Sequence, residues 1–161
     1  MFKIIEDKPP QWLLDNIASG TDKLKSNYTL ERLKLEQMIC FCLLYEDNKI
    51  VGFSGLQKFE GNTARVNSRC YITPEYRQYK IRNERVRYPW KYLAPYQIKV
   101  AEKLGYTNLF WSTELYKRPE KTMNLTIKYA SQYIPEGWQY RRLGHKDING
   151  VKQEVCQILK S

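Results

Sequence analysis

The sequence predicts a single α+β domain built on a mixed, mostly antiparallel sheet of six or seven strands. Residues 64–72 alternate and are rich in strand formers, and Pro74 ends this segment because proline has no backbone donor for a strand ladder. A helical pattern follows, and after it comes the short apolar strand 108–113. Strand, helix and strand in this order predict a crossover between two parallel neighbours. Strand-like segments on both sides of this unit place it at the centre of the sheet.

Length and composition fit one globular domain. The chain has 161 residues, of which 42% are hydrophobic, enough to bury a substantial core. No apolar run reaches eighteen residues, so we expect no membrane span. The first residues lack the charged and then apolar layout of a signal peptide. We therefore expect a cytoplasmic protein.

The four cysteines do not form a metal or redox motif. Cys40 and Cys42 are alternate residues of one predicted strand, and Cys70 and Cys156 lie far from them. His145 is the only histidine, so the sequence predicts no zinc site. We expect reduced, mostly buried thiols, which suits the cytoplasm.

The formal net charge is +10, from 27 lysines and arginines against 17 acidic residues. Such a field favours an anionic partner: nucleic acid, a phosphorylated cofactor or an acidic substrate. The alternative is a solvated lysine-rich surface. Basic residues gather close to the central turn, which favours an anion site there: Arg77, Lys80, Arg82, Arg85 and Arg87.

The N-terminal region predicts a strand and two helices. Residues 2–6 alternate as a first strand. A helix opens at Pro9 and Pro10, where proline is tolerated in the first turn, and should bury Trp12, Leu13 and Ile17. A second helix is predicted from residue 29, with a partial cap and three apolar positions: Leu30, Leu33 and Leu35.

Residues 38–57 predict a β-hairpin. The segment 38–45 is almost wholly apolar, 46–49 is a polar turn, and 50–57 returns as the next strand. A further turn over 60–63 leads into the central strand 64–72. Together these segments predict three antiparallel strands before the crossover.

Two prolines divide the segment between the central strands. Pro89 and Pro95 would break a regular helix, at roughly 3 kcal/mol in its interior, so we expect the helix to begin near one of them. Residues 81–88 would then form an extended arginine-rich loop that grips phosphate with side chains. Gly105 fits the C-terminal cap. The apolar helix positions are Trp90, Leu93, Tyr96, Val100, Ala101 and Leu104.

The C-terminal third predicts one more helix and two strands. Residues 114–119 form a loop, and 121–133 form a helix that should bury Met123, Ile127 and Ala130. The strands 138–143 and 151–159 follow, joined by a turn over 147–150.

Three short segments resemble the GNAT superfamily of acyl-CoA N-acyltransferases. Residues 72–77, Ile-Thr-Pro-Glu-Tyr-Arg, are similar to its V-x-P-x-Y-R segment; residues 50–53 to its I-V-G-F strand; and residues 133–138 to its Y-x-x-x-G-F segment. The resemblance covers nearly the whole chain in element order. It implies a three-layer fold with helices on both faces of the sheet and a splayed central parallel pair.

The resemblance also implies a reaction and a set of residues. In this family an acyl group passes from acetyl-CoA, as co-substrate, to an amine, and a glycine-rich turn holds the CoA pyrophosphate. Carried over to this sequence, the catalytic residues are Tyr133 as the acid that protonates the leaving thiolate, with Tyr129 as its substitute, and Glu114 as the base. The cofactor-binding residues are Cys70, Ile72, Arg77, Gln78, Tyr79, Lys80, Ile81, Arg82 and Asn83.

The turn itself departs from the family pattern, because Gln78, Lys80 and Arg82 replace its three glycines. Two functions therefore remain open. One is an N-acyltransferase acting on a small-molecule or protein amine, whose basic loop replaces the glycine turn. The other is a module of the same fold without catalysis, which binds nucleic acid or a protein partner through its basic surface. We expect a monomer or homodimer, with no membrane partner.

Overall fold

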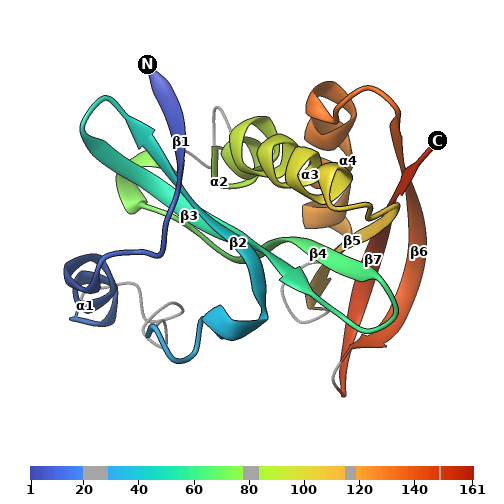
Figure 1. Cartoon of the computed structure of the whole chain (residues 1–161), viewed down its shortest axis with the longest axis horizontal. Helices are drawn as coiled ribbons and strands as arrows, with labels where there is room; N and C mark the ends of the chain where they lie inside the picture. Colours follow the sequence, from blue (N-terminus) through green and yellow to red (C-terminus); the bar gives the residue numbers. More distant parts are fainter. Residues whose placement is uncertain (20–28, 78–83, 115–118, 149) are drawn as a thin grey trace.

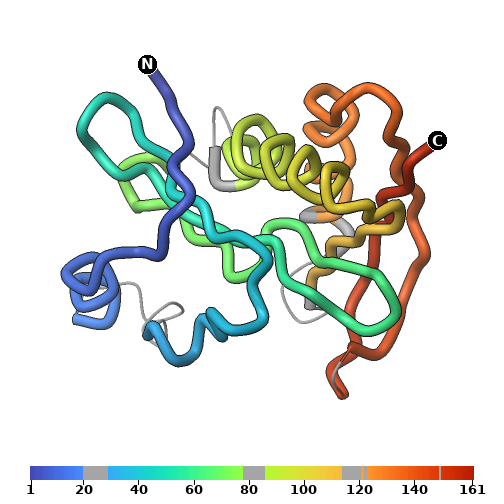
Figure 2. Tube along the Cα trace, viewed as in Figure 1, coloured from blue at the N-terminus to red at the C-terminus, as the bar shows by residue number. Residues whose placement is uncertain are grey.

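One sheet of seven strands forms the middle layer of the structure, which is a computed structural model (Figures 1 and 2). The structure describes residues 1–19, 29–77, 84–114, 119–148 and 150–161. The strand order is β1-β2-β3-β4-β5-β7-β6. Only β4 and β5 pair in parallel; the other neighbours are antiparallel. The predicted mixed sheet and its central parallel pair are confirmed. The strands are β1 (Phe2–Glu6), β2 (Met38–Glu46), β3 (Lys49–Lys58), β4 (Thr63–Ile72), β5 (Asn108–Glu114), β6 (Trp138–Ile148) and β7 (Val151–Lys160).

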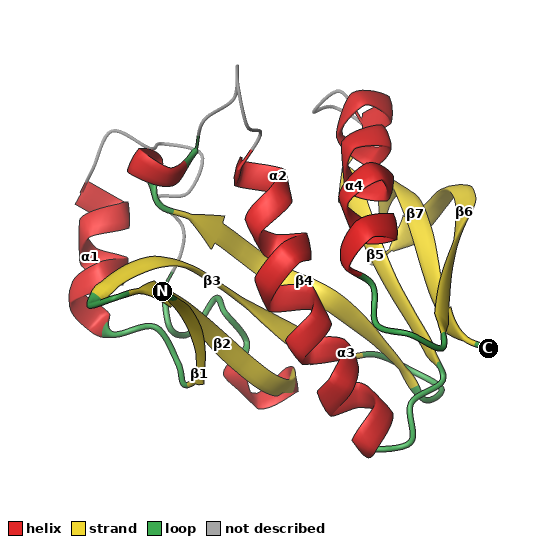
Figure 3. Cartoon of the chain, turned by 90° about the horizontal axis from the view of Figure 1, so that it is seen from above, coloured by secondary structure: helices red, strands yellow, loops and turns green. Residues whose placement is uncertain are grey.

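Helices cover both faces of this sheet (Figure 3). On one face lie α2 (Glu84–Tyr88), the π-helical turn η4 (Pro89–Leu93), α3 (Ala94–Lys103) and α4 (Pro119–Tyr133). On the other lies α1 (Gln11–Ser19), whose apolar side packs on β2 and β3. Each face has its own hydrophobic core. The three-layer arrangement is therefore confirmed.

The N-terminal region differs from the prediction in two ways. Leu13, Leu14 and Ile17 are the buried positions of α1, whereas Trp12 is 57% exposed. The predicted second helix from residue 29 is wrong: the described part of this segment consists of turns and the short 3-10 helix η2 (Leu35–Gln37). The backbone of Lys34 has φ of 51°, in the left-handed region that an α-helix cannot accommodate.

The crossover helix begins earlier than predicted. Residues 84–103 form one helical stretch through both prolines, so the expected extended loop is wrong for residues 84–88; residues 81–83 lie outside the described part of the chain. The π-helical turn explains the continuity. Pro89 opens this turn, where its carbonyl accepts from the amide of Ala94, and Pro95 lies in the first turn of α3. The wider turn therefore removes the conflict of proline with a regular interior.

The remaining elements follow the prediction closely. Gly105 has φ of 88° and ends α3, where the amide of Tyr106 donates to the Ala101 carbonyl at 3.0 Å, as in a glycine C-cap. Leu104, predicted as apolar core, is 59% exposed. The buried side of α4 includes Met123, Thr126, Tyr129 and Ala130. Strand β6 extends to Ile148, five residues beyond the predicted end at Leu143.

Cys40, Cys42 and Cys156 are buried and Cys70 is half-buried. Within the described ranges, no group of three or more metal-ligating side chains is placed to share an ion. No helix in the same ranges is long and apolar enough to cross a membrane.

Candidate functional site

The parallel strands β4 and β5 separate soon after they pair. Their register has only three partners, from Thr63 with Asn108 to Arg65 with Phe110. Beyond these, β4 continues to Ile72 and β5 to Glu114, and the two strands diverge (Figure 3). An open pair of this kind exposes backbone groups that a continuous ladder would use. The divergence is therefore the first feature of a candidate site.

Two bulges shape the diverging half of β4. Strand β4 has one more residue than β3 between the pairs Gly55–Ser68 and Phe53–Tyr71, and again between Gly55–Ser68 and Gln57–Arg65. Bulges turn side chains and backbone groups out of the regular pattern and are common beside active sites.

Each bulged interval contains a non-glycine residue with positive φ: Asn67 at 55° and Arg69 at 54°. Neither residue was predicted from the sequence, because strict alternation has no place for the extra residue that a bulge introduces.

A buried polar network holds the bulge at Asn67 from the side of the crossover helix. The backbone amide of Asn67 donates to Gln97 Oε1 at 2.8 Å, and its Nδ2 donates to the Pro89 carbonyl at 3.3 Å. Ser54 Oγ donates to Asn67 Oδ1 at 2.9 Å and accepts from Gln97 Nε2 at 2.8 Å. Ser54, Asn67 and Gln97 are all buried. The conformation of Asn67 is therefore fixed by hydrogen bonds from its amide and from both ends of its side chain.

Arg65 bridges the start of the divergence. Its Nη2 donates to the backbone carbonyl of Ser112 at 3.2 Å, so a side chain of β4 satisfies a carbonyl of β5 beyond the last paired residues. Ser112 Oγ in turn donates to Gln153 Oε1 on β7 at 2.6 Å. The diverging strands are thus joined by side chains where their ladder has ended.

The predicted cofactor-binding residues fall into two groups. Ile72 is buried, Cys70 is half-buried, and both lie on the diverging half of β4. Arg77 folds back on its own turn: its Nε donates to the Ile72 carbonyl at 2.5 Å, and its guanidinium lies 4.9 Å from the centre of the Tyr71 ring. The other predicted residues lie outside the described part of the chain: Gln78, Tyr79, Lys80, Ile81, Arg82 and Asn83.

The predicted acid, Tyr133, is the last residue of α4 and lies beside two cations of the crossover helix. Lys91 Nζ is 5.9 Å from the centre of the Tyr133 ring. Hydrogen bonding to Tyr133 raises the pKa of Arg87 above its ordinary value. We call Arg87 and Lys91 the cation pair. They are one helical turn apart and half-buried, and neither has an ion pair within the described ranges.

The candidate base Glu114 ends β5, but its side chain lies outside what the structure describes. Tyr129, the substitute acid, is buried one turn before Tyr133. A second carboxylate lies under α4: Glu154 is 3% exposed, and its Oε1 accepts two hydrogen bonds from Arg142. The Arg142–Glu154 pair was not predicted from the sequence, because its partners come from different strands.

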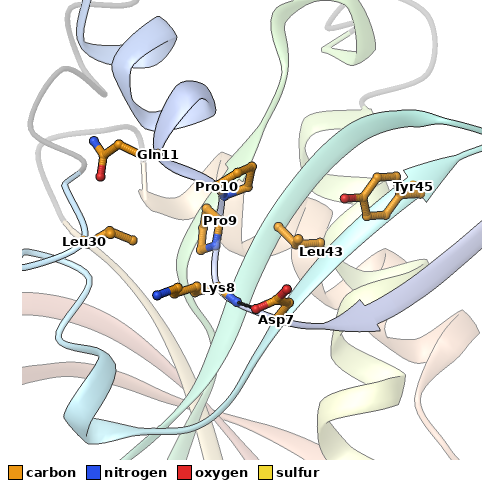
Figure 4. A pocket seen from close by; sticks show the side chains of 8 residues that line it. All are labelled: Asp7, Lys8, Pro9, Pro10, Gln11, Leu30, Leu43 and Tyr45. Carbon is orange, nitrogen blue, oxygen red and sulfur yellow. Dashed lines mark hydrogen bonds between the residues drawn. The ribbon is translucent and has the colours of Figure 1, made fainter.

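A separate cavity of about 380 Å³ lies away from the diverging strands (Figure 4). The β1–α1 connection lines one side with Asp7 and Lys8, and β2 lines the other with Leu43 and Tyr45. Strand β3 separates β2 from β4, so this cavity is not part of the site between β4 and β5.

Comparison with known proteins identifies the fold. No family profile matches the sequence, and no curated protein matches it significantly. Solved structures match over nearly the whole chain. A Bacillus subtilis acetyltransferase in complex with CoA is 15% identical, with a TM-score of 0.57, and covers 100% of this chain and 99% of its own. The ribosomal-protein-S18-alanine N-acetyltransferase of Escherichia coli is 15% identical, with a TM-score of 0.56 and coverages of 100% and 95%.

A GNAT-family acetyltransferase of Staphylococcus aureus is 14% identical, with a TM-score of 0.54 and coverages of 98% and 98%. The chain therefore has the GNAT acyl-CoA N-acyltransferase fold, as its three short segments indicate.

Proposed function

We propose that this protein transfers an acyl group from an acyl-CoA thioester to an amine. The observation that carries the proposal is the divergence of the bulged strand β4 from β5, with Tyr133 at the end of α4, the helix that packs on β5 and β7. This arrangement gives a thioester a place between two strands and a proton donor nearby. The CoA bound to the Bacillus subtilis neighbour of the same fold supports an acyl-CoA ligand.

In this reaction the amine nitrogen attacks the thioester carbonyl and the carbon–sulfur bond breaks. The negative charge that forms on the carbonyl oxygen needs donors placed in advance, and backbone amides on the part of β4 that no longer pairs with β5 suit this role. The Asn67 amide is excluded because it donates to Gln97 Oε1. The attacking ammonium must lose a proton, for which Glu114 or water is the proposed acceptor.

Tyr133 is the proposed acid. Its hydroxyl has one hydrogen to donate and lone pairs to accept, so hydrogen bonding to the Arg87 guanidinium leaves that hydrogen available for the departing thiolate.

The residues present fit the anionic part of CoA. The cation pair on α2 and η4 lies on a helix that begins just after the turn where the family holds pyrophosphate, and no carboxylate in the described ranges neutralises it. Phosphate groups are recognised well by such side chains. We therefore propose that side chains supply part of the grip that glycine amides supply elsewhere in this fold.

The decisive experiment begins with binding. Calorimetry with CoA and acetyl-CoA should show heat, and millimolar ligand should raise the melting temperature because it binds only the native state. Release of free thiol from acetyl-CoA should then be measured with a panel of primary amines. The Tyr133→Phe variant should keep CoA binding and lose about 100-fold in kcat, as expected for the loss of a general acid. Tyr140→Phe on β6 is the matched control and should retain activity.

The second candidate is a non-catalytic module that binds a polyanion. The unneutralised cation pair and the absence of the turn glycines favour it. If CoA gives neither heat nor stabilisation, the transferase proposal falls, and nucleic-acid affinity becomes the next measurement. Replacing Lys91 by alanine should then flatten the plot of log affinity against log salt by roughly 0.7–0.9 for each phosphate that the variant no longer neutralises.

A further inference from the structure

Arg69 has a backbone conformation that is costly for its residue type. Five non-glycine residues in the described ranges have positive φ. Lys34, Asp47 and Asn62 lie in turns, where this conformation is common, and Asn67 is held by its buried network. Arg69 lies in the middle of β4, with φ of 54°. A long side chain in this region of a strand is a true outlier.

The side chain of Arg69 carries a second cost. Its Nε is buried and has no hydrogen-bond partner within the described ranges. No ion pair or ring interaction compensates for it there. A buried donor without a partner is unfavourable, and the penalty grows when the group is charged. Glycine at this position would remove both costs.

Strain of this kind persists where the surrounding structure imposes it, and it is concentrated at ligand sites. Arg69 lies between Ser68 and Cys70, on the half of β4 that β5 has left. Arg65 donates through its Nη2 to a carbonyl of β5, whereas the side chain of Arg69 makes no such hydrogen bond in the described part of the chain. Arg69 as a whole is half-buried, so part of its side chain remains accessible to a ligand.

A single guanidinium presents a planar fork of donors, which matches a carboxylate. The phosphates of CoA have a different proposed place, at the cation pair on the crossover helix. We propose that Arg69 is a specificity-determining residue that binds a carboxylate carried by one of the two reacting substrates. This inference rests on the proposed acyl transfer. The carboxylate has two sources: the far end of a dicarboxylic acyl group, or an acceptor that is itself an amino acid.

The test compares matched substrates in four proteins: wild type, Arg69→Gly, Arg69→Lys and Lys34→Gly. The first substrate pair is succinyl-CoA against acetyl-CoA, and the second is an α-amino acid against its amide. The wild type should prefer the carboxylate in one pair by about 10- to 100-fold in kcat/KM, the range expected for hydrogen bonds to a charged group. The pair that shows the preference identifies the source of the carboxylate.

Arg69→Gly should abolish this preference while its Tm rises by roughly 2–4 °C, the shift expected for a modest stabilisation in a domain of this size. Arg69→Lys should keep part of the preference and none of the stabilisation. Lys34→Gly is the matched control, because it also removes a cation with positive φ. It should gain stability without any change in preference.

Several results would overturn the inference: no preference in either pair, a preference that survives in Arg69→Gly, or a lower Tm for that variant without ligand. If no protein shows acyl transfer, the proposed function fails by itself. The carboxylate site is then judged by the thermal shift with free succinate and with a free amino acid. A shift in the wild type that disappears in Arg69→Gly would support the site, and equal shifts in both proteins would refute it.

Discussion

Replacing Gln97 by methionine tests whether the buried network holds the bulge of β4. Gln97 is fully buried on α3, and its side chain accepts from the Asn67 amide and donates to Ser54 Oγ. Methionine has nearly the same length and shape, so the change removes two hydrogen bonds without leaving a large cavity. The Asn67 amide would then be a buried donor without a partner, and Ser54 would keep only its bond to the Asn67 side chain.

Each buried polar group without a partner costs about 1–3 kcal/mol, so Gln97→Met should lower the free energy of unfolding by about 2–4 kcal/mol. In a domain of this size this corresponds to a fall in Tm of roughly 5–15 °C. Urea denaturation measures the free energy directly. Gln132→Met, at an exposed position of α4, is the control and should stay within about 0.5 kcal/mol of the wild type. A Gln97→Met protein equally close to the wild type would refute the argument that this network fixes the bulge.

Two further predictions concern stability. The hydrogen bond from Tyr96 to Glu6 raises the pKa of Tyr96 to about 12 from its ordinary 10.0, so the unfolded chain loses this proton first as pH rises. The hydrogen bond stabilises the folded protein below pH 10, so the free energy of unfolding should fall between pH 10 and 12 more steeply in the wild type than in Tyr96→Phe. Urea unfolding across that pH range measures this, and equal slopes in the two proteins would refute the coupling. Leu33→Ala, at a fully buried position, should lower the free energy of unfolding by about 2–4 kcal/mol. Leu104→Ala, at a position 59% exposed, should lower it by about 0.5 kcal/mol or less, and similar losses for the two variants in thermal unfolding would contradict the assigned burial.

Local sequence patterns were sufficient to predict the sheet. Alternation, apolar runs and turn residues are properties of neighbouring positions, so the strands and the central parallel pair could be predicted. The place of β7 between β5 and β6 was not predicted. The I-V-G-F segment also has a local explanation. A Cβ at Gly52 would lie 2.3 Å from the Tyr71 carbonyl oxygen, so β3 can approach β4 only with glycine there.

The errors in the helices have nonlocal or conformational causes. The helix predicted after residue 29 fails at Lys34, whose left-handed backbone no local preference indicates. The crossover helix passes through Pro89 because a π-helical turn accommodates it, and such turns depend on tertiary packing. Trp12 satisfies the helical spacing, but Leu14 takes the buried place.

The candidate site was predictable only in part. Tyr133 and the basic character of the crossover region follow from short segments of sequence. The bulges, the Asn67 network and the isolation of the Arg69 Nε among the described residues depend on other elements. A sequence shows which residues are polar, but it does not show which polar atoms remain without a partner after folding.

The bulge and the proline-containing helix stabilise one another. A bulged strand has a backbone amide outside its ladder, and the Pro89 carbonyl, at the start of the π-helical turn, has a free lone pair beside the amide of Ala94. Asn67 satisfies both the bulge amide and the Pro89 carbonyl, because its own backbone amide donates to Gln97 and its side chain donates to Pro89. The bulge that shapes the proposed acyl site is therefore set by the same helix that carries the cation pair towards Tyr133. A change that straightens this helix at Pro89 should move both the bulge and the cation pair, and so disturb two parts of the site at once.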